Sequence, residues 1–168
     1  MKPTAAVFIA AFFAGAAYAT DIDWARIEPV DAQGMVWQSV QQGDQMKGMF
    51  AIPESDGVLL WMECAGKGAI TLSYLDADLE PLANNYAVHM KSGDQIIAVA
   101  GQTKERWEMD DIVELKTSAI KDARFLANLK KGNPLTLVII PGPKGSQGAF
   151  SLPSSGHALD PFFKSCSL

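Results

Sequence analysis

The fold class is decided by residues 58–75, which read VLLWMECAGKGAITLSYL. In the second half of this stretch apolar and polar residues alternate, so that Ile70, Leu72 and Tyr74 share one face and the residues between them point away, as in a β-strand with one buried side. The first five residues are apolar on both faces, which is typical of a strand covered on both sides. The Ala-Gly-Lys-Gly sequence between the runs supplies turn residues. The stretch therefore predicts an antiparallel hairpin.

Short apolar runs separated by turn residues continue from Met35 onward, the pattern of an all-β domain. The predicted strands are residues 36–40, 46–52, 58–64, 69–75, 85–90, 95–100, 106–109, 112–117, 135–140 and 148–152. The run at 135–140 is also apolar on both faces, so we expect it to be a central strand. These elements predict a mainly β fold, an antiparallel β-sandwich with two short helices and one disulfide; a strongly twisted barrel is the alternative.

Two segments are predicted to be helices. Residues 122–131 have apolar side chains on one side and end at a glycine followed by a proline. The second helix spans residues 157–165 with Ser155 as its N-cap, or begins at Pro161 with Asp160 as the cap. We expect one of its two phenylalanines, Phe162 or Phe163, to pack against the sheet and the other to be exposed.

The N-terminus predicts export. Residues 1–19 combine the positive charge of Lys2, an apolar run from Ala5 to Ala17 and a small-x-small ending, the features of a cleaved secretory signal peptide. The apolar run is too short to cross a bilayer, so we expect no stable membrane insertion. The expected organisation is a signal peptide over 1–19, a polar N-terminal lead-in over 20–34 that Trp24 and Ile27 anchor, and a single domain over 35–168. We expect the protein to be bacterial and either periplasmic or secreted.

The charge balance excludes some classes of partner. The formal net charge is −5, and loss of Lys2 with the signal makes the mature chain more negative. Such a charge repels phosphate backbones and anionic lipid surfaces. We therefore expect no nucleic-acid partner.

The chain has only two cysteines, Cys64 and Cys166. Because oxidising compartments favour disulfides, we expect these two to be bonded and to attach the C-terminus to the core. A redox-active pair or a metal site is the alternative, although the Cys-x-x-Cys spacing is absent.

The order of elements from Val58 to Cys166 includes a strand ending in cysteine, a helix with the pattern Leu-x-x-Leu-x-x-Gly over residues 126–132, and a closing stretch of Phe-x-Leu, Ser-Ser, Ala-Leu and Cys. This order resembles the type VI secretion accessory proteins of the VasI kind and, more distantly, the invasion-associated locus B proteins. The resemblance implies a periplasmic β-rich fold and no chemistry. The locus B proteins generally carry additional cysteines that are missing here.

Several residues are candidates for catalysis or metal binding. Ser154 and Ser155 precede His157, but residues so close on a turn rarely form a catalytic pair, and helix capping is the better interpretation. His89 has no partner at metal-ligand spacing. Acidic residues gather over 76–80 and 105–111 without the pattern of an EF-hand, and a solvated turn explains the first group. We expect no catalytic residue, no metal and no cofactor.

Aromatic residues offer one candidate binding site. The aromatics Trp37, Trp61, Trp107, Tyr74 and Tyr86 fall in predicted strands. Core packing explains most of them, whereas Trp107, flanked by Arg106 and Glu108, is the most plausible exposed anchor.

We expect a non-enzymatic periplasmic interaction module that binds another exported protein or an envelope component. The alternatives are a periplasmic hydrolase of unassigned residues, and an inhibitor or immunity protein against a lysozyme-like hydrolase, since an acidic domain suits a basic enzyme. A deep pocket with converging polar groups would favour the enzyme, and a shallow apolar patch would favour the binder.

Overall fold

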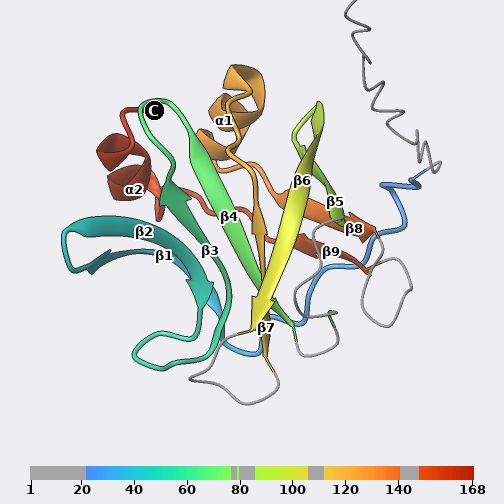
Figure 1. Cartoon of the computed structure of the whole chain (residues 1–168), viewed down its shortest axis with the longest axis horizontal. Coiled ribbons are helices and arrows are strands. Elements are labelled where there is room, and N and C mark those ends of the chain that lie inside the picture. The colour runs from blue at the N-terminus through green and yellow to red at the C-terminus, as the bar shows by residue number, and fades with distance from the viewer. Residues whose placement is uncertain (1–21, 77–78, 80–85, 106–111, 141–147) are drawn as a thin grey trace, which may run out of the picture.

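Nine strands form one antiparallel sheet in the computed structural model, which describes residues 22–76, 79, 86–105, 112–140 and 148–168 (Figure 1). The strand order is β1-β2-β3-β4-β7-β6-β5-β8-β9. Their bounds are Val36–Gln42 (β1), Gln45–Ala51 (β2), Val58–Cys64 (β3), Ile70–Asp76 (β4), Tyr86–Ser92 (β5), Gln95–Glu105 (β6), Val113–Thr117 (β7), Leu135–Ile140 (β8) and Gly148–Leu152 (β9). Within the described residues one hydrogen-bonded ladder joins all nine strands, so the mainly β class is confirmed and the sandwich of two sheets is not.

The sheet curls until its ends approach each other. The rings of Tyr74 on β4 and Phe150 on β9 lie 4.9 Å apart, although four strands separate β4 from β9 in the ladder. At the other end, the indole N–H of Trp37 on β1 donates to the carbonyl of Pro153 at 2.8 Å. Both contacts form on the same face, which is therefore concave. We call this the inner face and the opposite one the outer face.

The inner face carries the hydrophobic core. Strand alternation places Ile70, Leu72 and Tyr74 there, and all three are buried, as the sequence pattern predicts. The expectation that β4 has only one buried side is wrong at Ser73, which points to the outer face and is 1% exposed. Strand β8, expected at the centre, lies next to the edge strand β9.

Two helices close the top of the curled sheet (Figure 1). Helix α1 (Ala123–Lys130) begins after Asp122, whose carboxylate accepts the amide hydrogens of Arg124 and Phe125 at 3.0 and 2.8 Å. Such a cap is favourable because the first amides of a helix have no partner within it.

Helix α2 (Asp160–Ser165) is shorter than the predicted span 157–165 and begins one residue before the alternative predicted start at Pro161. Its N-cap is Leu159 and no side chain caps it, so the assignment of the cap to Ser155 or Asp160 is wrong. Proline fits near its start because the first turn needs no amide donor. A turn precedes the helix, in which the amide of Ala158 donates to the carbonyl of Ser155 at 3.0 Å.

Helix α2 packs on the inner face of β1 and β2. A Cβ atom added at Gly48 would lie 3.0 Å from Leu159 and 3.1 Å from Phe162, so a side chain at this position would crowd both residues. The hydroxyl of Ser39 donates to the carbonyl of Ala158 at 2.7 Å and accepts the amide of Phe162 at 3.3 Å.

The two phenylalanines of α2 are both buried. Phe162 is 0% and Phe163 1% exposed, with ring centroids 5.3 Å apart. The expectation that one of the pair is exposed is therefore wrong, because the core continues around the helix on two sides.

The Cys64–Cys166 disulfide is confirmed, with the two Cα atoms 5.2 Å apart. It joins the end of β3 to the residue after α2. A metal site at these cysteines is thereby excluded.

The N-terminal lead-in follows the free edge of β9. Pro29 pairs with Ser151 in a parallel bridge, and Val30 donates to the Ser151 carbonyl at 2.9 Å. Val30 and Ala32 pack against the core, while Trp24 and Ile27 are half-buried. The predicted strand at 106–109 and the signal sequence at 1–19 lie outside the described residues.

Candidate functional site

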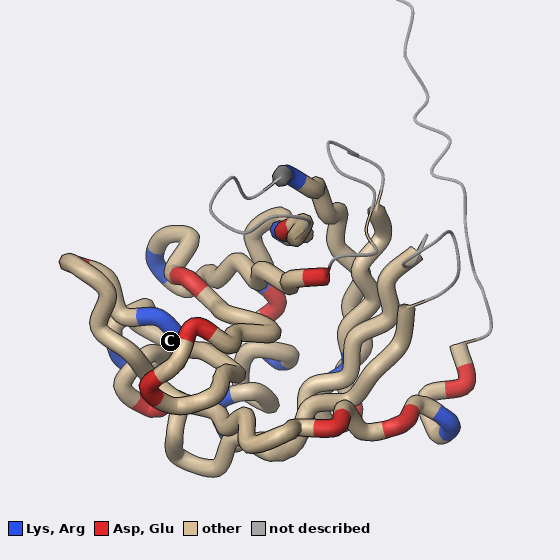
Figure 2. The backbone as a smooth tube through the Cα atoms, turned by 90° about the horizontal axis from the view of Figure 1, so that it is seen from below, with Lys and Arg blue, Asp and Glu red and all other residues tan. Residues whose placement is uncertain are grey.

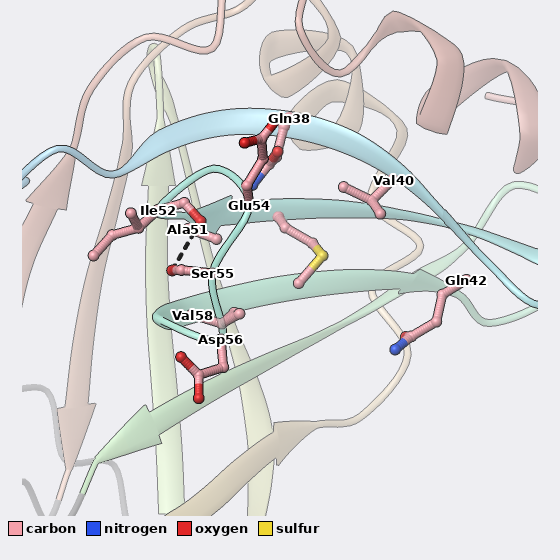
Figure 3. Close-up of a pocket in the computed structure, with 10 residues that line it drawn as sticks. Gln38, Val40, Gln42, Ala51, Ile52, Glu54, Ser55, Asp56 and Val58 are labelled. Atoms are coloured by element: carbon pink, nitrogen blue, oxygen red, sulfur yellow. Dashed lines mark hydrogen bonds between the residues drawn. The ribbon is translucent and has the colours of Figure 1, made fainter.

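A cleft opens on the outer face of the β1–β2 ribbon. It has a volume of about 720 Å³, within the range of ligand sites. Its walls are the outer faces of β1 and β2, the start of β3 and the loop from β2 to β3 (Figure 3). The lining residues are Gln38, Val40, Gln42, Met49, Ala51, Ile52, Glu54, Ser55, Asp56 and Val58.

The floor of the cleft is apolar because strand alternation brings Val40, Met49 and Ala51 to the same face. Val58 adds to it from β3. Two amide side chains, Gln38 and Gln42, stand beside this floor. Apolar area with a few polar groups is the usual composition of a binding site.

The loop from β2 to β3 forms the acidic rim of the cleft, which carries Glu54 and Asp56. Internal hydrogen bonds fix this loop: Ile52 donates its amide to the Gly57 carbonyl at 2.8 Å, and the Ser55 hydroxyl accepts the Gly57 amide at 3.0 Å. Glu54 has a φ of 58°, in the left-handed region that glycine prefers. The turn thus holds the Glu54 backbone in a conformation that costs free energy in a residue other than glycine.

A lysine–glutamate network lies next to the cleft on the outer face. Lys47 and Lys116 bind the Glu63 carboxylate at 2.7 and 2.6 Å. Partial burial acts to raise the pKa of Glu63, but the hydrogen bonds from Lys116 and Lys47 outweigh it and hold this pKa below its ordinary value. The Lys47 ammonium also lies 5.8 Å from the ring centroid of Trp61.

A second carboxylate on the outer face is buried. The Glu114 side chain is 4% exposed, accepts the Ser73 hydroxyl at 2.9 Å and pairs with Lys104 at 3.1 Å. Ser73 and Lys104 therefore compensate the buried negative charge of Glu114. This group stabilises β4 and β7 and does not line the cleft.

The binding residues proposed from sequence, Arg106, Trp107 and Glu108, lie outside the described residues. Trp37, Trp61, Tyr74 and Tyr86 are each at most 8% exposed. The expectation of core packing is confirmed for Trp37, Tyr74 and Tyr86, whereas Trp61 is buried on the outer face beside Lys47.

The serine and histidine candidates form no catalytic arrangement in the described part of the chain. Ser154 donates to the Gly132 carbonyl and accepts the Gly156 amide, which holds a turn. His157 pairs with Asp160 at 3.1 Å on the surface. His89 is half-buried on β5. Over the described ranges no three histidine, cysteine or carboxylate side chains are grouped as metal ligands.

The cleft was not predicted from sequence. The loop over residues 53–57 was recognised only as a turn, and the alternation in β1 and β2 was recognised only as strand. Two signals are present in the sequence. Glu54 and Asp56 lie in the turn after β2, and Gln38, Val40 and Gln42 lie at alternate positions of β1 and so share one face. Only the fold shows that the loop stands against that face.

Comparison with family models, with curated proteins and with solved structures finds no match to this chain. None of the helices in the described residues is long and apolar enough to cross a membrane.

Proposed function

We propose that this chain is an exported, non-enzymatic interaction module that binds another exported protein or an envelope component through the outer-face cleft. The observation that carries the proposal is the cleft itself, a preformed concavity with an apolar floor and a polar rim. Helix α2 packs on the opposite face of the same two strands and supports the shape of the cleft, and a preformed site loses little entropy on binding.

The composition of the cleft favours a binder over a hydrolase. A glycosidase needs a pair of carboxyl groups of which one lies in a desolvating environment. The two carboxylates of the cleft, Glu54 and Asp56, are both exposed. They suit the recognition of charge better than proton transfer.

Site-specific photocrosslinking tests the proposal. A benzophenone amino acid replaces Gln42, which lines the cleft, in the exported protein of producing cells. The matched control carries the same group at Gln102, an exposed position on β6. We expect one discrete adduct from position 42 that Met49→Asp abolishes, and none from position 102. Absence of a discrete adduct at position 42, or equal adducts at both positions, would contradict the proposal.

A further inference from the structure

The cleft carries negative charge that the described residues do not neutralise. Its ionisable groups are Glu54 and Asp56, and neither is in an ion pair within the described part of the chain. Lys47 lies on the neighbouring stretch of β2, but Glu63 binds it at 2.7 Å. Figure 2 shows the basic positions of the described chain dispersed rather than gathered on one face. A cationic segment bound in the cleft would therefore meet carboxylates that no cation of the described residues pairs with.

Hydrogen bonds fix the backbone of the loop that carries these two carboxylates. The Ser55 hydroxyl donates to the Ile52 carbonyl at 3.2 Å and accepts the Gly57 amide at 3.0 Å. Figure 3 shows the Ser55 bond and the side chains of Glu54 and Asp56 on this loop. Glu54 keeps its left-handed φ of 58°, which asparagine and glycine would adopt more readily.

The apolar floor provides a second kind of contact. Val40, Met49 and Val58 offer aliphatic and thioether surface at the base of the cleft, beside the amide groups of Gln38 and Gln42. Methionine adapts its shape to different apolar side chains. The amides can pair with a peptide backbone, because each has a donor and an acceptor.

Resting on the proposed function, we propose that the cleft binds a basic segment of the partner protein, with an arginine or lysine held by Glu54 and Asp56 and an adjacent apolar side chain on the floor. The acceptor oxygens match the guanidinium donors of arginine. The net negative charge of the chain would speed the approach of such a partner.

The experiment uses three blocked peptides of equal length, acetyl-Leu-Arg-Leu-amide and its Gln and Glu counterparts, titrated into the ¹⁵N-labelled mature protein at low salt. We expect the Arg peptide alone to shift the amide resonances of residues 52–58 and of β1 and β2, and high salt to weaken binding. Binding by the Gln peptide with equal affinity would overturn the inference. So would equal binding of spermidine, since charge alone would then suffice.

The decisive variant is Glu54→Asn with Asp56→Asn, because asparagine tolerates the left-handed conformation and the protein is expected to keep its fold. We expect its affinity for the Arg peptide to fall by about tenfold or more. Glu28→Gln, which removes one exposed carboxylate from the lead-in, is the matched control and is expected to bind as the unmodified protein does. Unchanged affinity in the double variant would overturn the inference.

The two proposals fail separately. If the photocrosslinked adduct at position 42 forms equally well in the Glu54→Asn, Asp56→Asn variant, the partner uses the cleft without a basic segment, and only the present inference falls. If no adduct forms in either background, the binding function of the cleft itself is wrong.

Discussion

The two faces of the β1–β2 ribbon are covered differently. On the inner face, Ser39 and Gly48 meet α2, and Trp37 and Phe50 join the core with ring centroids 5.3 Å apart. On the outer face the same two strands line an open cleft. Helix α2 of the same chain covers the inner face, whereas the described residues leave the cleft on the outer face open. Strand alternation produces both, since neighbouring residues point to opposite sides.

The largest expected effect comes from the disulfide that holds α2 against the inner face. The double variant Cys64→Ala, Cys166→Ala opens a loop of 102 residues, so we expect a loss of about 4 to 5 kcal/mol in the free energy of unfolding. Urea titration measures it, and reduction of the unmodified protein should reproduce the shift. An unchanged midpoint in both cases would show that the inner face is closed by packing alone.

The next test removes the packing of α2. Phe162→Ala and Phe163→Ala should each lower the free energy of unfolding by about 3 to 5 kcal/mol, because each leaves a cavity in the core. Lys164→Ala, an exposed position on the same helix, is the control and should change little. A large loss for only one phenylalanine would mean that the core does not extend around both sides of the helix.

The outer face contains a buried carboxylate, Glu114, which pairs with Lys104, and the third test breaks this ion pair. Lys104→Met leaves the Glu114 carboxylate without its cation, so we expect a loss of about 1 to 3 kcal/mol in unfolding free energy. Glu114→Gln removes the charge and retains an acceptor for Ser73, so it should cost less. Equal stability of Lys104→Met and the unmodified protein would show that the ion pair contributes nothing to this face.

The smallest effect concerns Glu63. Glu63→Gln should cost about 1 kcal/mol at neutral pH, since the carboxylate is half-buried between two lysines. The pKa of Glu63 is lower in the folded state than its ordinary value of 4.5, so the carboxylate stabilises the fold above pH 4.5 and this contribution is lost as the pH falls through the folded-state pKa. Chemical denaturation of both proteins across this range should show the difference vanish in acid. A difference that is constant with pH would contradict the role of the charge.

The elements of the fold were largely predictable. Strand β3 (Val58–Cys64), strand β8 (Leu135–Ile140) and strand β9 (Gly148–Leu152) have the predicted bounds. The other described strands differ by a few residues, most of all β6, which continues to Glu105. Alternation is a local property, so it is visible in the sequence. The longer of the two predicted spans of α2, 157–165, was wrong because its first residues form the turn that docks Ala158 against Ser39.

The number of sheets could not be predicted in the same way. A strand buried on both faces occurs in a sandwich and also in a curled sheet whose outer face has its own buried patch. Ser73 and Glu114 form such a patch, and neither residue type predicts burial. The pairing of β4 with β7 rather than β5 brings them together, and that pairing is non-local.

The sequence by itself determined the mainly β class, the hairpins and the candidate bond between Cys64 and Cys166. Turn residues and alternation are local features of the chain. Two cysteines allow only one pairing with each other. Only the tertiary structure decided the strand order, the curl and the cleft, because each depends on which distant segments meet. Glu54 and Asp56 become part of a site only because the loop that carries them stands against the outer face of β1 and β2.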